Sequence, residues 1–536
     1  MTESATNGEH AAGLPASTEL TAPGRPPGPA RREGARFRGV FAVVTAGIVV
    51  VNLDMFIVNV AIPSIARSFS DAGLASLSWV LNGYAIVFAA LLVPAGRAAD
   101  RIGRRAAFLA GMIVFGAASA ACAAAPGVWV LVTARVVQAA GAALLMPASL
   151  GLLLAAAPDG RRVAMIRAWT SVGGAAAALG PVIGGALVTA SWHWVFLVNV
   201  PVVAAAVAAS LRYLPAGQAP RPGRGGRPTR AEAGLAEAEQ VEAGLAEAGQ
   251  VEAGQAGAEA LPDVAGAVLF TIAAGLLALG IVKAADWGWT SPALLGSLTA
   301  AALLAAAFAW RSARHPAPVI EPHLLRQPVF ATATAANVAF GAAFGAMLLM
   351  ITLWCQDVWH WSALRTGLGV APGPLLVPFF AIAAGPAARR LGPGPVAVLG
   401  CAVYAAGCVY WRLSLALTPD YPAGMLPGML LTGTGVGLTL PTLVSAAVSA
   451  VPPQRFATGS GIVTMARQLG IVLGVAVLVT VLGQATGAGA LPAFQRAAVV
   501  LAAAAACAGL VALLLIPAQA ALLRRAPGTT PPGVPE

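Results

Sequence analysis

Fourteen stretches of mainly apolar residues recur along this chain, each about 20 residues long. A helix of that length crosses the ~30 Å hydrocarbon core of a bilayer, where helices and closed barrels satisfy their backbone hydrogen bonds internally. Charged residues make up 10% of the sequence, against about 25% in a soluble chain. The sequence therefore predicts an all-α polytopic membrane protein. The stretches lie near 40–62, 78–96, 106–125, 128–152, 166–190, 195–214, 262–282, 292–310, 330–354, 366–386, 395–413, 423–447, 461–484 and 496–518.

The basic residues test this division independently, because Lys and Arg accumulate in cytoplasmic loops. With the N-terminus in the cytoplasm, 25 of the 32 basic residues fall on the cytoplasmic side, five fall outside, and Arg135 and Arg467 lie within spans. A single Lys beside abundant Ala, Gly, Pro and Arg is typical of a high-GC bacterium. We therefore expect a multi-pass protein of the bacterial cytoplasmic membrane with both termini in the cytoplasm.

The spans fall into six, a pair and six more, which indicates two six-helix halves joined by an inserted pair, as in rocker-type secondary transporters. The expected organisation is a disordered cytoplasmic tail over 1–38, a six-helix bundle over 39–214, a cytoplasmic linker over 215–261, two inserted transmembrane helices over 262–311, a second six-helix bundle over 328–518 and a tail over 519–536. The linker contains a ten-residue repeat, Gly234–Ala243 against Gly244–Ala253. We interpret it as a solvated linker, with a regulatory docking element as the alternative.

Neither the charge nor the cysteines indicate a nucleic-acid or metal site. The basic residues behind the net charge of +11 are distributed over the cytoplasmic loops and tails and do not form one patch, so no nucleic-acid partner is expected. The five cysteines lie in or beside apolar stretches without metal-ligand spacing, so we expect neither a metal site nor a disulfide framework. The expected partners are the lipid bilayer, protons and a small amphipathic substrate, and a monomer suffices for this architecture.

Asp54 is the one acid clearly inside a span, and it lies in the first. A carboxylate near mid-membrane is costly, so it should face a cavity or a partner. Burial favours its neutral form, which would let it exchange protons. We therefore interpret Asp54 as a proton carrier or a substrate counter-ion, with a structural hydrogen-bond acceptor as the alternative.

Two arginines lie within spans and also need acceptors. Arg135 in the fourth span is interpreted as a coupling residue, with Asp54 as one candidate partner and a fixed structural pair as the alternative. Arg467 in the thirteenth span, followed by Gln468, is a second buried cation in the other half.

Two glycine-rich segments suggest moving parts. The loop between the second and third spans is interpreted as a conformational switch, in which Asp100 should meet a helix N-terminus across the interface between the halves; a plain basic loop is the alternative. Its switch residues are Gly96, Asp100, Arg101, Gly103 and Arg104. The fifth span is interpreted as a hinge that also seals the pathway against ion leak, with close helix packing as the alternative. Its hinge residues are Gly180, Pro181, Gly184 and Gly185.

Together these segments resemble the fourteen-span drug/proton antiporter branch of the major facilitator superfamily, the EmrB/QacA-like transporters. The string Leu53–Pro63 is similar to that branch's L-D-x-x-I-V-N-V-A-L-P signature, and Gly96–Arg105 to the superfamily's G-x-x-x-D-R-x-G-R-R motif. Arg135–Gly141 is similar to R-x-x-Q-G-x-G, and Gly180–Gly185 to the antiporter motif of the fifth helix. Trp194–Pro201, Gly459–Gly461 and Arg467–Gly470 also look familial.

The resemblance implies the major facilitator fold and proton-coupled export of amphipathic drugs or antibiotics from the cytoplasm or inner leaflet. It assigns proton coupling to Asp54 and Arg135 and the conformational switch to Asp100 with its neighbours. It assigns the antiport hinge to Gly180 and Pro181. Two departures stand out. Ala139 replaces a glycine of the fourth-helix motif, and the second half lacks the additional intramembrane acid that exporters of dicationic drugs often carry. The second departure argues against dicationic substrates.

Other functions are also compatible with these sequence features. The same fold could export an endogenous metabolite, a lipid or a siderophore. A membrane enzyme would need paired acids, histidines or a metal site at a membrane face, and this chain shows one buried Asp, so we do not expect an enzyme. A transporter-like sensor could use the 215–261 linker to bind a partner. No G-x-x-x-x-G-K-[ST] loop is present, so the expected energy source is the proton motive force, with no cofactor.

Overall fold

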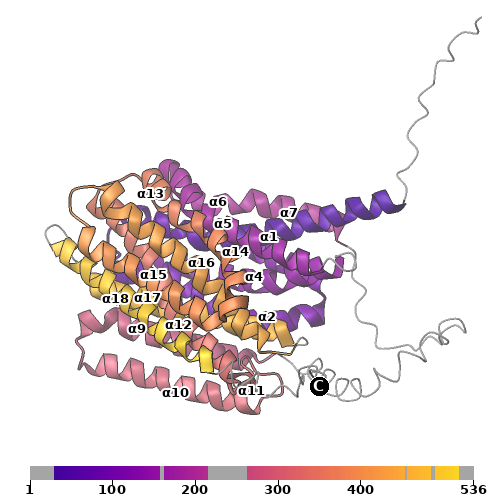
Figure 1. The fold of residues 1–536 in the computed structure, drawn as a ribbon. Helices are drawn as coiled ribbons and strands as arrows, with labels where there is room; N and C mark the ends of the chain where they lie inside the picture. The colour runs from indigo at the N-terminus through magenta and orange to yellow at the C-terminus, as the bar shows by residue number, and fades with distance from the viewer. Residues whose placement is uncertain (1–28, 157–161, 215–261, 453–454, 484–488, 518–536) are drawn as a thin grey trace, which may run out of the picture.

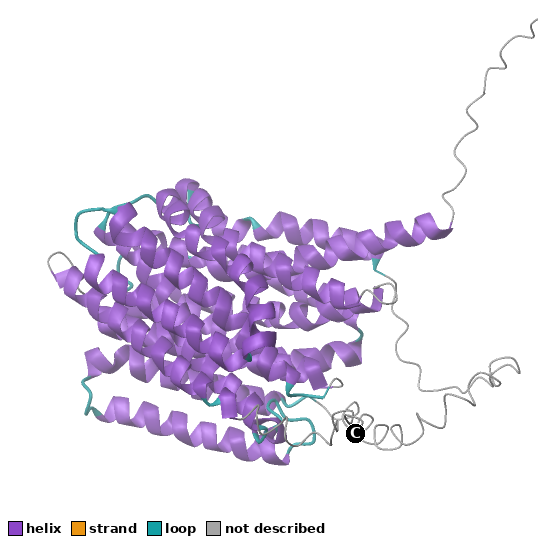
Figure 2. Ribbon diagram, in the orientation of Figure 1, coloured by secondary structure: helices purple, strands orange, loops and turns teal. Residues whose placement is uncertain are grey.

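The structure is a computed structural model that describes residues 29–156, 162–214, 262–452, 455–483 and 489–517. Throughout these ranges the secondary structure is helical (Figures 1 and 2), and fourteen helical segments are long and apolar enough to cross a membrane. The expected count of fourteen spans is thus confirmed. The 215–261 linker with its repeat, residues 1–28 of the first tail and the whole of the second tail, 519–536, lie outside the described residues.

Six spans form the N-terminal bundle. The helices α1 and α5 pack against each other, as do α3 and α4, and α2 packs against α4. The sixth span consists of two consecutive segments, α6 and α7. The elements are α1 (Pro29–Ser68), α2 (Leu74–Ile102), α3 (Arg104–Ala123), α4 (Val128–Ala156), α5 (Arg162–Ala190), α6 (Trp194–Leu197) and α7 (Asn199–Tyr213). Helix α1 begins at Pro29, inside the segment 1–38 expected to be a disordered tail, so that boundary is corrected.

Six further spans form the C-terminal bundle, in which several spans are interrupted. A π-helical turn, η1, ends the ninth span, and another, η2, begins the twelfth. The elements are the short α11 (Pro322–Leu325), α12 (Pro328–Leu353) with η1 (Trp354–Val358), α13 (Ala363–Val370), α14 (Pro372–Leu391), α15 (Pro393–Ser414), η2 (Tyr421–Met425), α16 (Leu426–Ser449), α17 (Phe456–Leu482) and α18 (Ala490–Leu513).

The inserted pair, α9 (Val264–Trp287) and α10 (Pro292–Arg314), lies along one side of the molecule (Figure 1). Helix α9 packs against both α2 and α17, so it covers the line where the two bundles meet. Asp263 accepts a hydrogen bond from Gly266 N at 2.8 Å as the N-cap of α9, and it pairs with Arg311 Nε at 2.6 Å. The Thr480 hydroxyl of α17 donates to the Ile281 carbonyl of α9 at 2.6 Å.

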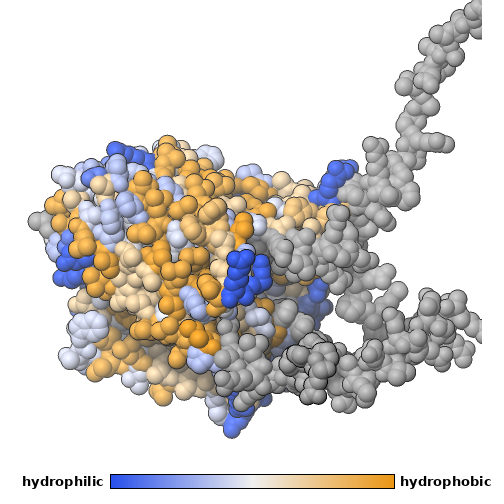
Figure 3. All heavy atoms as spheres, viewed as in Figure 1, coloured by the Kyte–Doolittle hydropathy of each residue, from blue (hydrophilic) through white to orange (hydrophobic). Residues whose placement is uncertain are grey.

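The bundles contact each other mainly through two helix pairs, α2 with α17 and α5 with α13. We call the end of the molecule that carries Arg97, Arg101, Arg104 and Arg105 the arginine-rich end. The α5–α13 contact lies toward the opposite end, near the last residue of α5. Apolar side chains cover much of the face seen in Figure 3, as expected of a surface that meets lipid.

Candidate functional site

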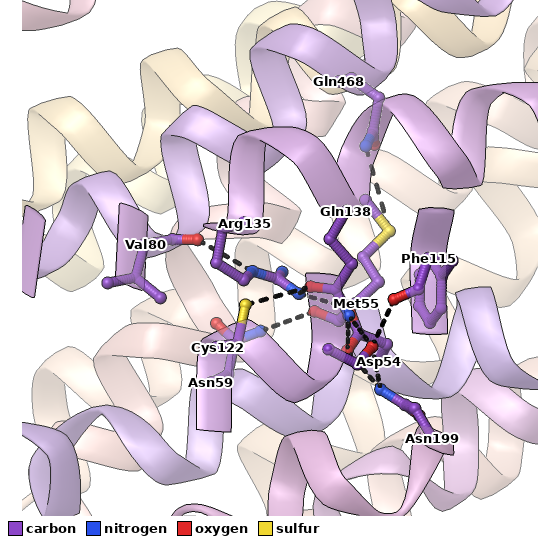
Figure 4. Close-up of polar contacts among 11 residues, drawn as sticks. Asp54, Met55, Asn59, Val80, Phe115, Cys122, Arg135, Gln138, Asn199 and Gln468 are labelled. Atoms are coloured by element: carbon purple, nitrogen blue, oxygen red, sulfur yellow. Dashed lines mark hydrogen bonds and ion pairs between the residues drawn. The ribbon is translucent and has the colours of Figure 1, made fainter. Parts of the chain in front are cut away.

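Asp54 lies inside the N-terminal bundle, with 0% of its surface exposed. It belongs to the middle of α1, and three side chains from neighbouring helices donate hydrogen bonds to its carboxylate (Figure 4). Oδ1 accepts from Gln138 Nε2 and Asn199 Nδ2, both at 2.9 Å, and Oδ2 accepts from Arg135 Nη1. This set of donors satisfies an ionised carboxylate, which acts as an acceptor alone.

Arg135 on α4 is the counter-charge of Asp54 and is 1% exposed. Its Nη1 also donates to Gln138 Oε1 at 2.7 Å, and its Nε donates to the Val80 carbonyl of α2 at 3.3 Å. The guanidinium carbon lies 4.1 Å from the centroid of the Tyr84 ring, which adds a cation–π contact. The sequence left open whether Asp54 was the partner of Arg135, and the structure places the two in contact.

A hydrogen-bond network extends the pair to α3 and α7. Gln138 Nε2 donates to Ser119 Oγ at 2.8 Å, and Ser119 in turn donates to the Phe115 carbonyl at 2.8 Å. Sequence reasoning missed Ser119, Asn199 and Tyr84 as parts of this site. An amide inside the apolar Trp194–Pro201 string was the available signal for Asn199, whereas nothing in the sequence marks Ser119.

The network borders a small cavity between the bundles. The cavity measures about 40 Å³, enough for a few water molecules. Met55, Asn59, Tyr84 and Arg135 line it from the N-terminal bundle, but Asp54 does not. The C-terminal bundle contributes the rest of its wall, which consists of Phe344, Gly345, Leu348, Ile471 and Val475. Arg135 is therefore the member of the ion pair that faces the inter-bundle cavity, and Asp54 lies behind it.

A larger cavity of about 680 Å³ lies toward the end opposite the arginine-rich one, and it has the size of a drug-binding pocket. Residues of α1, α2, α17 and α18 line it together with the η1 turn. Asp357 and His360 are the titratable residues in its wall. Both bundles contribute to this cavity, so its shape depends on how they sit against each other.

The loop between α2 and α3 does not make the contact expected of it. The Asp100 side chain is 66% exposed and pairs with Arg104, 3.5 Å away in the next turn. Arg104 also donates to the Gly151 carbonyl of α4 at 3.2 Å. The expected contact of Asp100 with a helix N-terminus across the bundle interface is thus wrong in this conformation.

Gly103 has φ +91°, a backbone conformation that favours glycine, and Gly96 packs on Pro147 within the same bundle. Arg101 lies in the last turn of α2 and is exposed.

Arg97, one residue after Gly96, instead links the bundles at the arginine-rich end. Its Nη2 lies 3.6 Å from Glu321 Oε1, and Glu321 Oε2 accepts from Arg455 Nη1 at 2.6 Å. Glu321 precedes α11, and Arg455 is the N-cap of α17. One carboxylate therefore joins α2 of the N-terminal bundle to the C-terminal bundle, and nothing in the sequence marks this pairing.

We expect Glu321→Gln to loosen this link. The three side chains are 16–40% exposed, so solvent screens the pairs, and their loss should shift the balance between bundle arrangements by about 1 kcal/mol, or roughly fivefold. The readout is the thiol reactivity of Val93→Cys, because Val93 contacts Gly461 across the α2–α17 interface. Reactivity should rise about fivefold, and adding Arg97→Gln should change little more. Arg326→Gln, an exposed change near the same end, is the control. Equal reactivity in all variants would exclude a linking role.

The glycines of α5 lie between two neighbouring helices. A Cβ added at Gly180 would lie 2.7 Å from the Phe56 Cβ of α1, and one at Gly184 would lie 2.9 Å from the Ile57 carbonyl oxygen. A Cβ at Gly185 would lie 2.5 Å from the Ala363 carbonyl of α13, across the bundle interface. On the other side of that interface, a Cβ at Gly367 would collide with the Pro181 carbonyl oxygen. At the segment Gly180–Gly185 the two bundles thus approach each other through backbone atoms.

Arg467 and Gln468 lie in the middle of α17. Gln468 is 0% exposed, and its Nε2 lies 4.0 Å from the sulfur of Met55, the neighbour of Asp54. Its Oε1 has no hydrogen-bond partner among the described residues. Arg467 is partly buried and forms no ion pair with any carboxylate in the described ranges. The two arginines predicted within spans therefore differ, since only Arg135 has a counter-charge.

Two six-helix bundles, an inserted pair and a buried ion pair beside an inter-bundle cavity define a carrier of the secondary-transporter class. Comparison with known sequences gives the family: the chain belongs to the Major Facilitator Superfamily, whose sequence model matches residues 44–475. The resemblance read from the motifs is thereby confirmed.

Similar proteins include several whose names describe resistance to antibiotics. The chain is 30% identical to the methylenomycin A resistance protein of Streptomyces coelicolor, over 82% of this chain and 84% of that protein. It is 31% identical to the tetracenomycin C resistance and export protein of Streptomyces glaucescens, over 86% and 80%. Among solved structures, a proton-dependent oligopeptide transporter superposes with a TM-score of 0.58 over 90% of this chain and 99% of its own, at 15% identity, which shows a shared fold.

Proposed function

We propose that this protein is a proton-coupled antiporter that exports amphipathic small molecules, including antibiotics, across the bacterial cytoplasmic membrane, and that it is not an enzyme. The arginine-rich end is the cytoplasmic one, as the distribution of basic residues favours. The observation that carries the proposal is the fully buried Asp54–Arg135 pair at the edge of the inter-bundle cavity. The names of the resistance and export proteins to which the chain is similar support the substrate class.

The hydrogen bonds of Asp54 explain how a proton could drive the cycle. Ionised, the carboxylate accepts from Arg135, Gln138 and Asn199 at once. Protonated, it becomes a donor itself and loses its charge, so it can no longer hold the guanidinium as firmly. Arg135 already lines the cavity and would then be free to turn toward it. Protonation and the position of Arg135 are therefore coupled, and a bundle rearrangement that moves Arg135 would change proton binding in return.

The remaining features fit this cycle. The Arg97–Glu321–Arg455 link closes the cytoplasmic end, and the 680 Å³ cavity is the vestibule from which substrate leaves. Gly185 and Gly367 let α5 and α13 approach at the outer end, which prevents a continuous proton leak. A proton that crosses 100 mV gains ~2.3 kcal/mol, enough to support roughly a fiftyfold substrate gradient.

Reconstituted protein tests this proposal directly. Proteoliposomes with a luminal pH dye are prepared at pH 6 and diluted into buffer at pH 7.5, and cationic, neutral and anionic amphiphiles are added outside. Inward substrate movement should then expel protons and raise the luminal pH faster than in protein-free liposomes. An ionophore that equalises the pH beforehand should remove the response. A luminal pH that follows the protein-free control for every compound would overturn the proposed exchange.

A further inference from the structure

Arg467 is a guanidinium deep in the membrane without a counter-charge. It lies nine residues after Thr458, where the thirteenth span begins, which corresponds to ~14 Å along a helix that crosses a ~30 Å core. Among the described residues no carboxylate lies within ion-pair distance, and its side chain forms no hydrogen bond. An unpaired charge at this depth is costly in free energy. A packing role alone therefore does not explain an arginine at this position.

The position of Arg467 on α17 places it on the side of the helix that faces the inter-bundle cavity. Residues four apart lie on one helix face, so Arg467 shares a face with Ile471 and Val475. Both of these line the inter-bundle cavity, and Arg467 is one turn nearer the arginine-rich end. The adjacent Gln468 contacts Met55 of the same cavity and keeps its buried Oε1 without a partner. A second face of α17, which carries Thr480, meets the inserted helix α9.

The charges near the middle of the pathway do not balance. Asp54 neutralises Arg135, which leaves Arg467 as an uncompensated positive charge near the middle of the described spans. Guanidinium binds carboxylates with two parallel hydrogen bonds and is more weakly hydrated than ammonium, so it is suited to bind an organic anion away from water. A cationic substrate would meet repulsion at the same place.

We propose that Arg467 binds the acidic group of the substrate, and that the preferred substrates are amphipathic organic anions such as carboxylic acids. This inference rests on the proposed export function and names the substrate class for it. The apolar wall formed by Phe344, Leu348 and Ile471 takes the hydrocarbon part, and the unpaired Gln468 Oε1 accepts a hydroxyl or amide hydrogen of the ligand. Because Arg135 stays paired while Asp54 is ionised, the anion is directed to the C-terminal bundle.

Three dansyl probes of similar size and different charge test this assignment. Dansyl-6-aminohexanoate is an anion, its methyl ester is neutral and dansylcadaverine is a cation. Dissociation constants with purified full-length protein are measured from energy transfer between tryptophan and dansyl. Wild type should bind the carboxylate about tenfold more tightly than the ester and bind the cation most weakly. Arg467→Gln should weaken carboxylate binding about tenfold and leave ester binding within about twofold, whereas Arg467→Lys should keep part of the preference.

Several outcomes separate this role from the alternatives. Arg412→Gln, the same change at an exposed arginine near the end of α15, should leave all three constants unchanged. Removing an unpaired charge from inside the membrane should not lower the melting temperature, so a less stable Arg467→Gln, or one that binds all probes equally poorly, would show a packing role instead. Wild type without preference for the anion overturns the assignment. If neutral or cationic amphiphiles still drive proton exchange in the proteoliposomes, the export function survives that result; if no compound does, the export function itself fails.

Discussion

Replacing Asp54 by asparagine should reduce substrate-driven proton flux by at least about 100-fold. Asparagine is nearly the same size but cannot take up or release a proton, and it removes the counter-charge of Arg135. Breaking a buried ion pair from one side costs about 3–5 kcal/mol, because the remaining charge stays buried. Its amide would also present donors where Arg135, Gln138 and Asn199 already donate. We therefore expect a lower melting temperature together with the loss of proton flux in the luminal pH assay.

Two further variants separate these effects. The double variant Asp54→Asn/Arg135→Gln removes both charges, so it should regain much of the thermal stability but none of the proton flux. Asp286→Asn makes the same change at a half-exposed carboxylate that pairs with Lys283, and it should behave like wild type. Proton flux that persists in Asp54→Asn at the wild-type rate would assign the carrier role to another group.

Gly367→Ala should strongly impair transport by preventing α13 from closing on α5. The added Cβ would meet the carbonyl oxygen of Pro181, a backbone atom that cannot rotate away. Overpacking typically costs 1–3 kcal/mol, and here the cost applies to the state in which the outer ends are in contact. The population of that state should therefore fall by about 5–150-fold, and substrate-driven proton flux should fall with it.

A glycine on the same helix pair provides the matched control. Gly174 on α5 has no atom within 4 Å of an added Cβ, so Gly174→Ala should transport within about twofold of wild type. A cysteine at Val182, which lies beside Gly367, reports the separation of the helices. Its reaction with a thiol reagent should accelerate in the Gly367→Ala background and not in the Gly174→Ala background. Normal flux in Gly367→Ala would show that the close contact of α5 and α13 is dispensable.

These experiments concern different stages of one cycle. The Asp54 and Arg135 variants test proton coupling. The Gly367 variant tests closure of the outer end, and the Glu321 variant tests closure of the arginine-rich end. Arg467 concerns the substrate alone. The variants should therefore give distinct combinations of proton flux, thiol reactivity and probe binding, rather than one graded loss of activity.

Much of the site could be predicted from isolated polar residues in apolar spans. Asp54 and Arg135 are conspicuous because charge is rare at that depth, and the motif resemblance joined them to one function. Asn199 and Ser119 were missed because small polar residues are common in membrane helices, where they bond to their own backbone as readily as to another helix. The Arg97–Glu321 link was missed because it joins residues more than 200 positions apart near helix ends, where charges are expected anyway.

The sequence by itself determined the number of spans, their division into six, two and six, and the family, because hydrophobic length and local motifs depend on neighbours along the chain. The tertiary structure alone decided which charges meet. Asp54 and Arg135 are 81 residues apart and pair because α1 and α4 pack together, while Arg467 has no partner because the described part of the C-terminal bundle brings no carboxylate to it. Electrostatic energy depends on distance in space and on local burial, and neither is encoded in the spacing along one helix.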